Sequence, residues 1–237
     1  MNGCAPQTAP RLAERGAAAG GCDFRQLRHH TKNLLQRILL EIEQAQNTAL
    51  TLCGRRLLAD LQRRILLSAQ ISDALFGITL SPASMSKRLR VLSESTIRML
   101  ADATQLIRLD VSVSGDCPEP LQHVALRIAH EFVANAVKHG MHARVRGTID
   151  VHLATGRDGS TRLVVTDDGW GFRGTPAAGD GLQIAGDLAA SARGTISLQR
   201  THVTVAELLT PPPRAERACQ DGSTEPGLCA RQQQGRD

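Results

Sequence analysis

Residues 130–140 read HEFVANAVKHG, and they carry the clearest chemical signal in the chain. On a regular helix, Glu131, Asn135, Lys138 and His139 fall at positions i, i+4, i+7 and i+8, so they share one face. A carboxylate, an amide and an ammonium on one face suit a hydrated Mg²⁺ ion and the oxygens of a phosphate. A solvated helix face with chance polar residues gives the same pattern, so the stretch needs support from elsewhere in the chain.

Residues 167–172, DDGWGF, form a second polar cluster directly after an apolar run. A carboxylate that leaves a strand, such as Asp167, can accept a hydrogen bond from an exocyclic amine. Gly169 and Gly171 would let the backbone approach a flat ligand closely. Taken alone, an ordinary Asp-Gly turn explains the same residues.

Residues 179–182, GDGL, form a third cluster at the start of a predicted helix. A glycine-rich turn at a helix N-terminus presents free N–H groups and the positive end of the helix dipole, which together bind phosphate. The candidate residues are Gly179, Gly181 and Leu182. A plain helix cap by Asp180 is the alternative interpretation.

The apolar pattern around the three clusters predicts an α+β sandwich over about 105–210. Alternating apolar residues predict strands over 107–113, 149–153, 196–198 and 203–205, and a run of three apolar residues predicts one over 163–165. Helices are predicted over 119–140, with Gly140 as the C′ glycine, and over 181–192. Consecutive hairpins give a mixed, mainly antiparallel sheet with its helices on one face, and they exclude a doubly wound parallel fold.

A helical hairpin is predicted before the sandwich, over residues 22–80. The apolar seam of its first helix consists of Phe24, Leu27, Thr31, Leu34 and Ile38. Spacings of three and four are those of a heptad, and a second helix follows a break near Gly54. Such a hairpin often dimerises into a four-helix bundle.

The remaining segments join or flank these two units. Ser81 as N-cap and Pro82 at the first helical position predict a connecting helix over 81–104. Residues 1–21 are rich in glycine and alanine, and 211–237 open with three prolines, so both are expected to be disordered. No apolar run is long enough for a membrane span, and the N-terminus has no secretory signal, so the chain is expected in the cytoplasm.

Together and in this order, the three clusters resemble the N, G1 and G2 boxes of the Bergerat-fold ATPases, the GHKL superfamily that includes histidine kinases and gyrase-type ATPases. The resemblance covers about 105–210 and implies that the chain uses ATP and Mg²⁺. It places Asn135 on the metal, with Glu131 assisting metal binding or deprotonation. The residues that it places on the nucleotide are Asp167, Gly169 and Gly171 at the adenine, and Lys138, Gly179, Gly181 and Leu182 at the phosphates.

Residues 27–36, LRHHTKNLLQ, resemble the phosphoacceptor helix of histidine kinases, in a variety with the motif L-x-H-R-x-K-N. Aligning Lys32 and Asn33 with its K-N makes His29 the phosphoacceptor. The heptad agrees, because it places His29 at an exposed f position and His30 at g, beside the seam. His30 stands where the family usually carries arginine or an acid, which leaves open the group that assists proton removal.

These resemblances imply a homodimeric two-component histidine kinase. His29 would be phosphorylated from ATP and would pass the phosphoryl group to an aspartate on the receiver domain of a response regulator. Related kinases carry an amide or hydroxyl four residues after the histidine to orient water, so Asn33 implies a phosphatase activity toward the regulator as well.

Two other functions stay open. A histidine phosphotransfer protein with a degenerate ATPase domain would shuttle phosphoryl groups without ATP. The short segment 172–178 favours this reading, because the ATP lid of many relatives is longer. An anti-sigma factor or serine kinase of the same superfamily would act by sequestering a partner, but such proteins generally lack a phosphoacceptor hairpin.

The formal charge of +5 is confined to one part of the chain. Residues 22–110 hold 13 basic and 8 acidic side chains, while the rest is balanced. Aromatic residues make up 2%, which argues against a stacking platform for single-stranded nucleic acid. Six scattered cysteines suit neither a zinc site nor a disulfide scaffold. A basic hairpin around His29 is therefore interpreted as a docking field for an acidic receiver domain, with a merely solvated basic face as the alternative.

Overall fold

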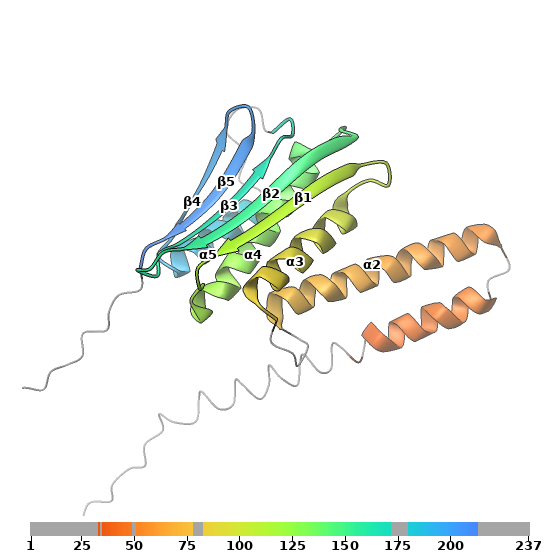
Figure 1. The fold of residues 1–237 in the computed structure, drawn as a ribbon. Helices are drawn as coiled ribbons and strands as arrows, with labels where there is room; N and C mark the ends of the chain where they lie inside the picture. Colours follow the sequence, from red (N-terminus) through yellow and green to blue (C-terminus); the bar gives the residue numbers. More distant parts are fainter. Residues whose placement is uncertain (1–32, 34, 49–50, 78–82, 172–179, 213–237) are drawn as a thin grey trace, which may run out of the picture.

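The computed structural model describes residues 33, 35–48, 51–77, 83–171 and 180–212. Residues 35–48 form a helix that lies beside α2 (Leu52–Phe76), where Gln46 donates a hydrogen bond to Gln62. The two helices form an arm that projects from the rest of the molecule (Figure 1). The predicted hairpin is thus present in the described range.

The turn of this hairpin differs from the prediction. Thr51 is the N-cap of α2, and its side chain accepts a hydrogen bond from the backbone N–H of Gly54. The prediction of a break near Gly54 is wrong, because Thr51 satisfies a free N–H of the first turn and Gly54 is tolerated inside it. Gly77 ends α2 in the left-handed conformation, with φ of 60°.

A five-stranded sheet has the order β1-β2-β3-β5-β4. Its strands are β1 (Leu106–Ser114), β2 (Arg146–Thr155), β3 (Thr161–Asp167), β4 (Thr195–Arg200) and β5 (Thr204–Thr210). The pair β1–β2 is parallel, and the other three pairs are antiparallel. The predicted mixed, mainly antiparallel sheet is confirmed.

Three helices cover one face of this sheet: α3 (Met85–Leu100), α4 (Glu119–Asn135) and α5 (Asp180–Ser191) (Figure 1). The core between the layers is aliphatic, and Phe132 is the one aromatic residue in it within the described chain. Side chains such as Leu126 and Ile149 are fully buried, and each such residue stabilises the fold by about 1.5–3 kcal/mol. The α+β class inferred from the sequence is confirmed.

Helix α3 begins later than predicted. Its N-cap is Ser84, whose hydroxyl accepts a hydrogen bond from the N–H of Lys87, so the prediction of a cap at Ser81 is wrong. Leu89 and Leu92 of α3 are fully buried against the rest of the core. Much of the predicted connecting segment therefore forms part of the helical layer. None of the helices in the described ranges is long and apolar enough to cross a membrane.

Candidate functional site

The last turn of α4 leads into a π-helical turn, Ala136–Gly140. The N–H of Met141 donates to the carbonyl oxygen of Ala136 at 2.8 Å, which is the i→i+5 bond of such a turn. Glu131 and Asn135 are half-buried on α4, whereas Lys138 and His139 are exposed on the wider turn. The sequence predicted these four side chains on one regular helix, but only Glu131 and Asn135 lie on α4. Single π turns are frequent at functional sites.

Gly140 closes this turn for a reason other than the predicted one. It is not among the residues with positive φ, so the prediction of a left-handed C′ glycine is wrong. An added Cβ would lie 2.4 Å from Oδ1 of Asp167, so only glycine fits between the π turn and the end of β3. Gly140 therefore joins the first predicted cluster to the second.

Asp167 is the last residue of β3 and is 5% exposed. Its Oδ1 accepts a hydrogen bond from the N–H of Gly169 at 3.0 Å, which fixes the orientation of the carboxyl group. Burial raises the pKa of Asp167 above its ordinary value, and the bond from Gly169 opposes the shift only in part. A buried carboxyl with a fixed orientation is suited to recognise one donor group.

Gly169 and Gly171 are required by contacts within the protein. A Cβ on Gly169 would lie 2.2 Å from the carbonyl oxygen of Gly140, and the N–H of Trp170 donates to that oxygen at 2.8 Å. Gly171 has φ of +61°, and its Cβ would lie 2.7 Å from Oγ1 of Thr204. At Gly169 the close approach is therefore that of one turn to another, and the approach of a flat ligand to these glycines stays a prediction.

Thr204 is a candidate site residue that the sequence did not indicate. It pairs with Asp167 across β3 and β5, and it is buried. Its hydroxyl makes no well-aligned hydrogen bond within the described chain, but it lies close enough to the Asp167 carboxyl group to lower the pKa of that group. A buried hydroxyl without a well-aligned bond is costly, so a ligand or a bound water molecule beside Asp167 would complete its hydrogen bonding. Only the strand register, which the sequence does not give, places it beside Asp167.

The first turn of α5 lies against the carboxyl group of Glu131. A Cβ on Gly181 would lie 2.5 Å from Oε2 of Glu131. This contact brings the first and third predicted clusters together. Leu182 is half-buried and packs against the hydrophobic core, which anchors the start of α5. Gly179 lies outside the described residues.

An arginine fixes the loop beside Asp167. Arg144 donates to the carbonyl oxygen of Asp168, and its guanidinium lies 5.8 Å from the ring centre of Trp170. The carboxyl group of Asp168 accepts a hydrogen bond from the N–H of Thr148 at 2.9 Å. Trp170 is 64% exposed at this edge, so it borders the site without being part of the core.

Several predicted residues fall elsewhere. His29, His30 and Lys32 lie outside the described residues, so the phosphoacceptor stays a prediction. Asn33 is the first residue described, and it is helical and exposed. Across the described ranges, no three His, Cys, Asp or Glu side chains are grouped to hold a metal ion. A magnesium ion here would depend on nucleotide oxygens and water for most of its ligands, as is usual for Mg²⁺.

Solved structures give the match that sequence comparison does not. Comparison with protein-family models gives no match, and comparison with curated proteins gives none. The histidine kinase domain of the blue-light activated kinase from Erythrobacter litoralis EL346 superposes with a TM-score of 0.52 at 13% identity, over 76% of this chain and 94% of that one. The chain has the fold of a histidine kinase core.

A second structure of the Erythrobacter litoralis EL346 blue-light activated histidine kinase agrees. It has a TM-score of 0.51 at 17% identity, over 75% of this chain and 60% of that chain. The likeness confirms the expected arrangement of a helical region followed by an α+β sandwich. At this level of identity it concerns the fold, and the chemistry of the site must be argued from its own residues.

Proposed function

We propose that the chain is a two-component histidine kinase that phosphorylates its own His29 from ATP and passes the phosphoryl group to an aspartate of a receiver domain. One observation carries this proposal. In a histidine kinase fold, the buried carboxyl group of Asp167 and the buried hydroxyl of Thr204 lie beside each other on paired strands. A donor and an acceptor site held in this way suit the edge of a purine base.

The adenine of ATP fits these two groups. Asp167 accepts a hydrogen bond from the exocyclic amine, provided that its carboxyl group is ionised. The Thr204 hydroxyl supplies a further bond, directly or through water, and so completes the hydrogen bonding that is poorly aligned within the described chain. Trp170 borders the same loop and gives the chain a single tryptophan whose fluorescence reports on nucleotide.

The phosphates fit the other half of the site. Asn135 and Glu131 at the end of α4 would hold Mg²⁺, which neutralises charge on the phosphate oxygens when it is bound. The first turn of α5, at Gly181, presents free N–H groups to anions. Exposed Lys138 can reach a phosphate oxygen as a mobile point charge. The close approach of Gly181 to the Glu131 carboxyl group supports a metal ion and phosphate groups bound side by side.

The reaction needs an exposed imidazole and an oriented γ-phosphate. A neutral ring nitrogen of His29 attacks phosphorus, the bond to the β-phosphate oxygen breaks, and the imidazole then loses its proton. A receiver carboxylate later attacks the phosphorus of the phosphohistidine, the N–P bond breaks, and the ring nitrogen takes up a proton from solvent so that it leaves as neutral imidazole. Asn33 stands four residues after His29 in the sequence and would orient water for hydrolysis of the phosphorylated regulator.

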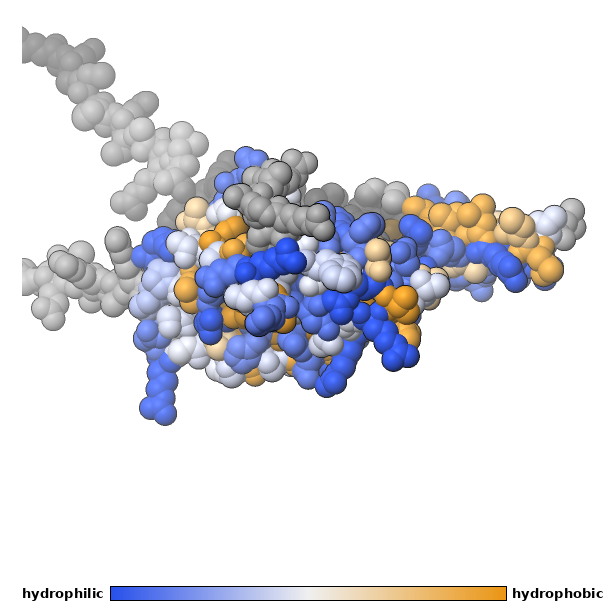
Figure 2. Space-filling model, turned by 90° about the horizontal axis from the view of Figure 1, so that it is seen from above, coloured by the Kyte–Doolittle hydropathy of each residue, from blue (hydrophilic) through white to orange (hydrophobic). Residues whose placement is uncertain are grey.

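A homodimer is part of the proposal. The arm carries apolar side chains that the rest of the described chain does not cover, and they gather along its length (Figure 2). The most exposed large ones on the arm are Leu40, Leu52 and Leu57. Exposed apolar patches of this kind mark protein interfaces, and a second copy of the arm would complete a four-helix bundle. Because ATP and receiver domains occur in the cytoplasm, we propose that the chain acts there.

Labelling with ATP that carries a radioactive γ-phosphate tests the proposal. We expect acid-labile, base-stable label on the wild-type chain in the presence of Mg²⁺. The label should be lost in His29→Ala, which leaves the nucleotide site intact, and in Asn135→Ala, which leaves the phosphoacceptor intact. A wild-type chain that binds ATP in calorimetry without becoming labelled would instead indicate a binding protein. A chain that does not bind ATP at all would indicate a phosphotransfer protein.

A further inference from the structure

A groove runs between α2, the C-terminal end of α3 and the start of β1. It consists of two hollows of about 370 Å³ and about 580 Å³, and both have Arg63 and Arg98 in their walls. Apolar side chains form much of its lining, among them Leu66, Ile97 and Leu106. Leu66 is 45% exposed and Leu106 is 63% exposed, so this apolar surface is uncovered in the described chain.

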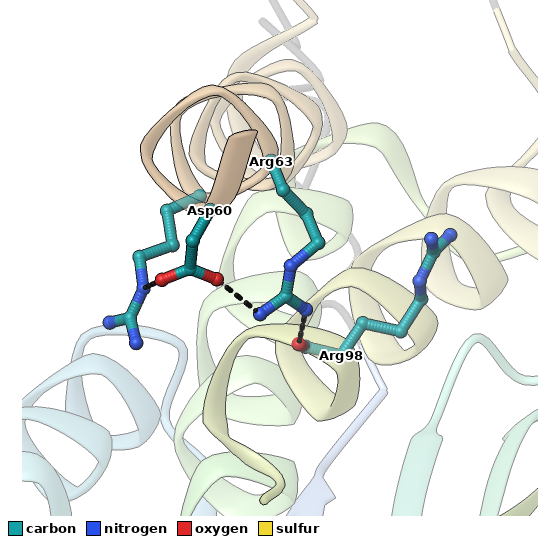
Figure 3. A network of polar contacts seen from close by, with 4 residues as sticks. Asp60, Arg63 and Arg98 are labelled. Carbon is teal, nitrogen blue, oxygen red and sulfur yellow. Dashed lines mark hydrogen bonds and ion pairs between the residues drawn. The ribbon is translucent and has the colours of Figure 1, made fainter. Parts of the chain in front are cut away.

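The groove carries an excess of positive charge. Arg63 donates to Asp60 and to the carbonyl oxygen of Arg98, and this contact ties α2 to α3 (Figure 3). The side chain of Arg98 extends away from that pair (Figure 3). Neither the Arg98 nor the Arg108 guanidinium has a hydrogen bond or ion pair within the described chain, and Asp102 is the one acid among the lining residues. Two guanidinium groups are therefore available beside an apolar surface.

The terminal segments of this chain do not complement the groove. Residues 1–32 hold five basic and two acidic side chains, and 213–237 hold four of each. Neither segment carries the negative charge that two unpaired arginines would attract. Charge complementarity therefore favours a different molecule as the occupant.

The geometry points to this groove as the docking site for an acidic segment of a partner protein. The carboxylates of this acidic segment would pair with Arg98 and Arg108, and the apolar side chains of the segment would pack against Leu106 and Ile97. An apolar centre with charged groups around it is the usual anatomy of such interfaces, and arginine is favoured there because its fork pairs with carboxylates. The occupant would touch both the arm and the sandwich. The inference does not depend on kinase activity, because it concerns a surface away from Asp167 and Asn135.

A short fluorescent peptide of glutamate and leucine is the probe, and its counterpart with glutamine in place of glutamate is the control peptide. Binding to the full chain is measured by anisotropy at low salt, where exposed charges are least screened. We expect the double variant Arg98→Ala/Arg108→Ala to bind the acidic peptide about tenfold more weakly, as loss of two partly exposed charge pairs implies. The matched control is Arg157→Ala/Arg193→Ala, which removes the same charge from exposed positions elsewhere. It should bind like the wild type.

Two further measurements locate the binding. Hydrogen exchange with the peptide bound should slow within 59–70 and 97–108. The charge-reversed variant Arg98→Glu/Arg108→Glu should gain affinity for a lysine–leucine peptide, a gain that misfolding does not produce. Equal weakening in both alanine variants, no binding of the acidic peptide to the wild type, or protection confined to 35–48 would overturn the proposal. A change in oligomeric state in Arg98→Ala/Arg108→Ala would also overturn it, because it would assign the groove to a second copy.

Discussion

Replacing Gly169 with alanine tests the contact between the two turns that form the candidate site. An added Cβ would lie 2.2 Å from the carbonyl oxygen of Gly140 and 2.3 Å from its carbonyl carbon. Both atoms belong to backbone, so one of the two turns must move by about 1 Å to restore an ordinary contact distance. Such a movement separates Asp167 from the π turn that follows Asn135.

The expected cost has two parts. Overpacking of a well-packed position costs about 1–3 kcal/mol. The hydrogen bond from Trp170 N–H to the carbonyl oxygen of Gly140, at 2.8 Å, is strained or broken. Its loss adds about 1 kcal/mol. Together they lower the free energy of unfolding by about 2–4 kcal/mol, which lowers the melting temperature of a chain of this size by roughly 5–15 °C.

Thermal unfolding followed by circular dichroism measures this effect, and ATP binding is measured on the same samples through the fluorescence of Trp170. Gly186→Ala is the matched control, because the nearest atom to its added Cβ is Cδ1 of Ile196 at 4.0 Å. Gly186 lies within α5, so alanine there should leave stability unchanged or raise it by up to about 1 kcal/mol. The reasoning is refuted if the Gly169 variant melts with the wild type and binds ATP as tightly.

Three further predictions concern the groups around the site. Asp167→Asn should abolish measurable ATP binding in calorimetry. Because burial raises the pKa of Asp167, the wild-type affinity for ATP should weaken on acidification at a higher pH than it would with an ordinary aspartate. An affinity that stays constant down to about pH 4 would contradict this. Thr204→Val removes a buried hydroxyl that makes no well-aligned hydrogen bond, so the free energy of unfolding should change by less than about 1 kcal/mol while ATP affinity falls, and Thr204→Ser should restore the affinity. Burial lowers the pKa of His130, so the folded chain disfavours protonation of this ring. The free energy of unfolding therefore has its full value above the ordinary histidine pKa and decreases as the pH falls below that value. In urea titrations at about pH 7.5 and about pH 5, His130→Gln should lose less stability than the wild type, and an equal loss would count against the assignment.

Much of the sheet could be predicted because its signal is local. The alternation of apolar and polar residues in 149–153 and the apolar run 163–165 fall inside β2 and β3. Alternation depends only on which side chains face the core. The order of the strands in space required the hairpin rule as well, and that rule gives two of the four strand pairs, β2–β3 and β4–β5. The antiparallel pair β3–β5 and the parallel pair β1–β2 do not follow from it.

Helix ends were predicted less well, because several nearby residues compete for the same role. Ser81 and Ser84 both precede the same apolar pattern, and the hydroxyl that caps α3 is that of Ser84. At the hairpin turn, the sequence indicated a break near Gly54, whereas the structure has Thr51 as the N-cap of α2 and Gly54 inside the first turn. A cap is decided by which hydroxyl reaches a free N–H, and that depends on packing of the whole helix.

The sequence could not predict how the three clusters of the site lie relative to one another. Only glycine fits at position 140, because Asp167 approaches it from a strand distant in the chain. Thr204 becomes a candidate site residue only through the register of β5 with β3, which sets it beside Asp167. The π turn at Ala136–Gly140 likewise has no periodic signature of its own. These features depend on contacts between elements, whereas the motif residues themselves could be found one cluster at a time.

The most direct test is to locate the phosphate after the full chain has been incubated with ATP and Mg²⁺. Mass spectrometry of peptides kept at neutral or basic pH preserves phosphohistidine and distinguishes neighbouring residues. We predict phosphate on His29 in the wild-type chain and none on this residue in Asn135→Ala. Phosphate found only on serine or threonine, on His30 instead of His29, or on no residue while ATP is bound would contradict the assignment of this chain as a histidine kinase that uses His29.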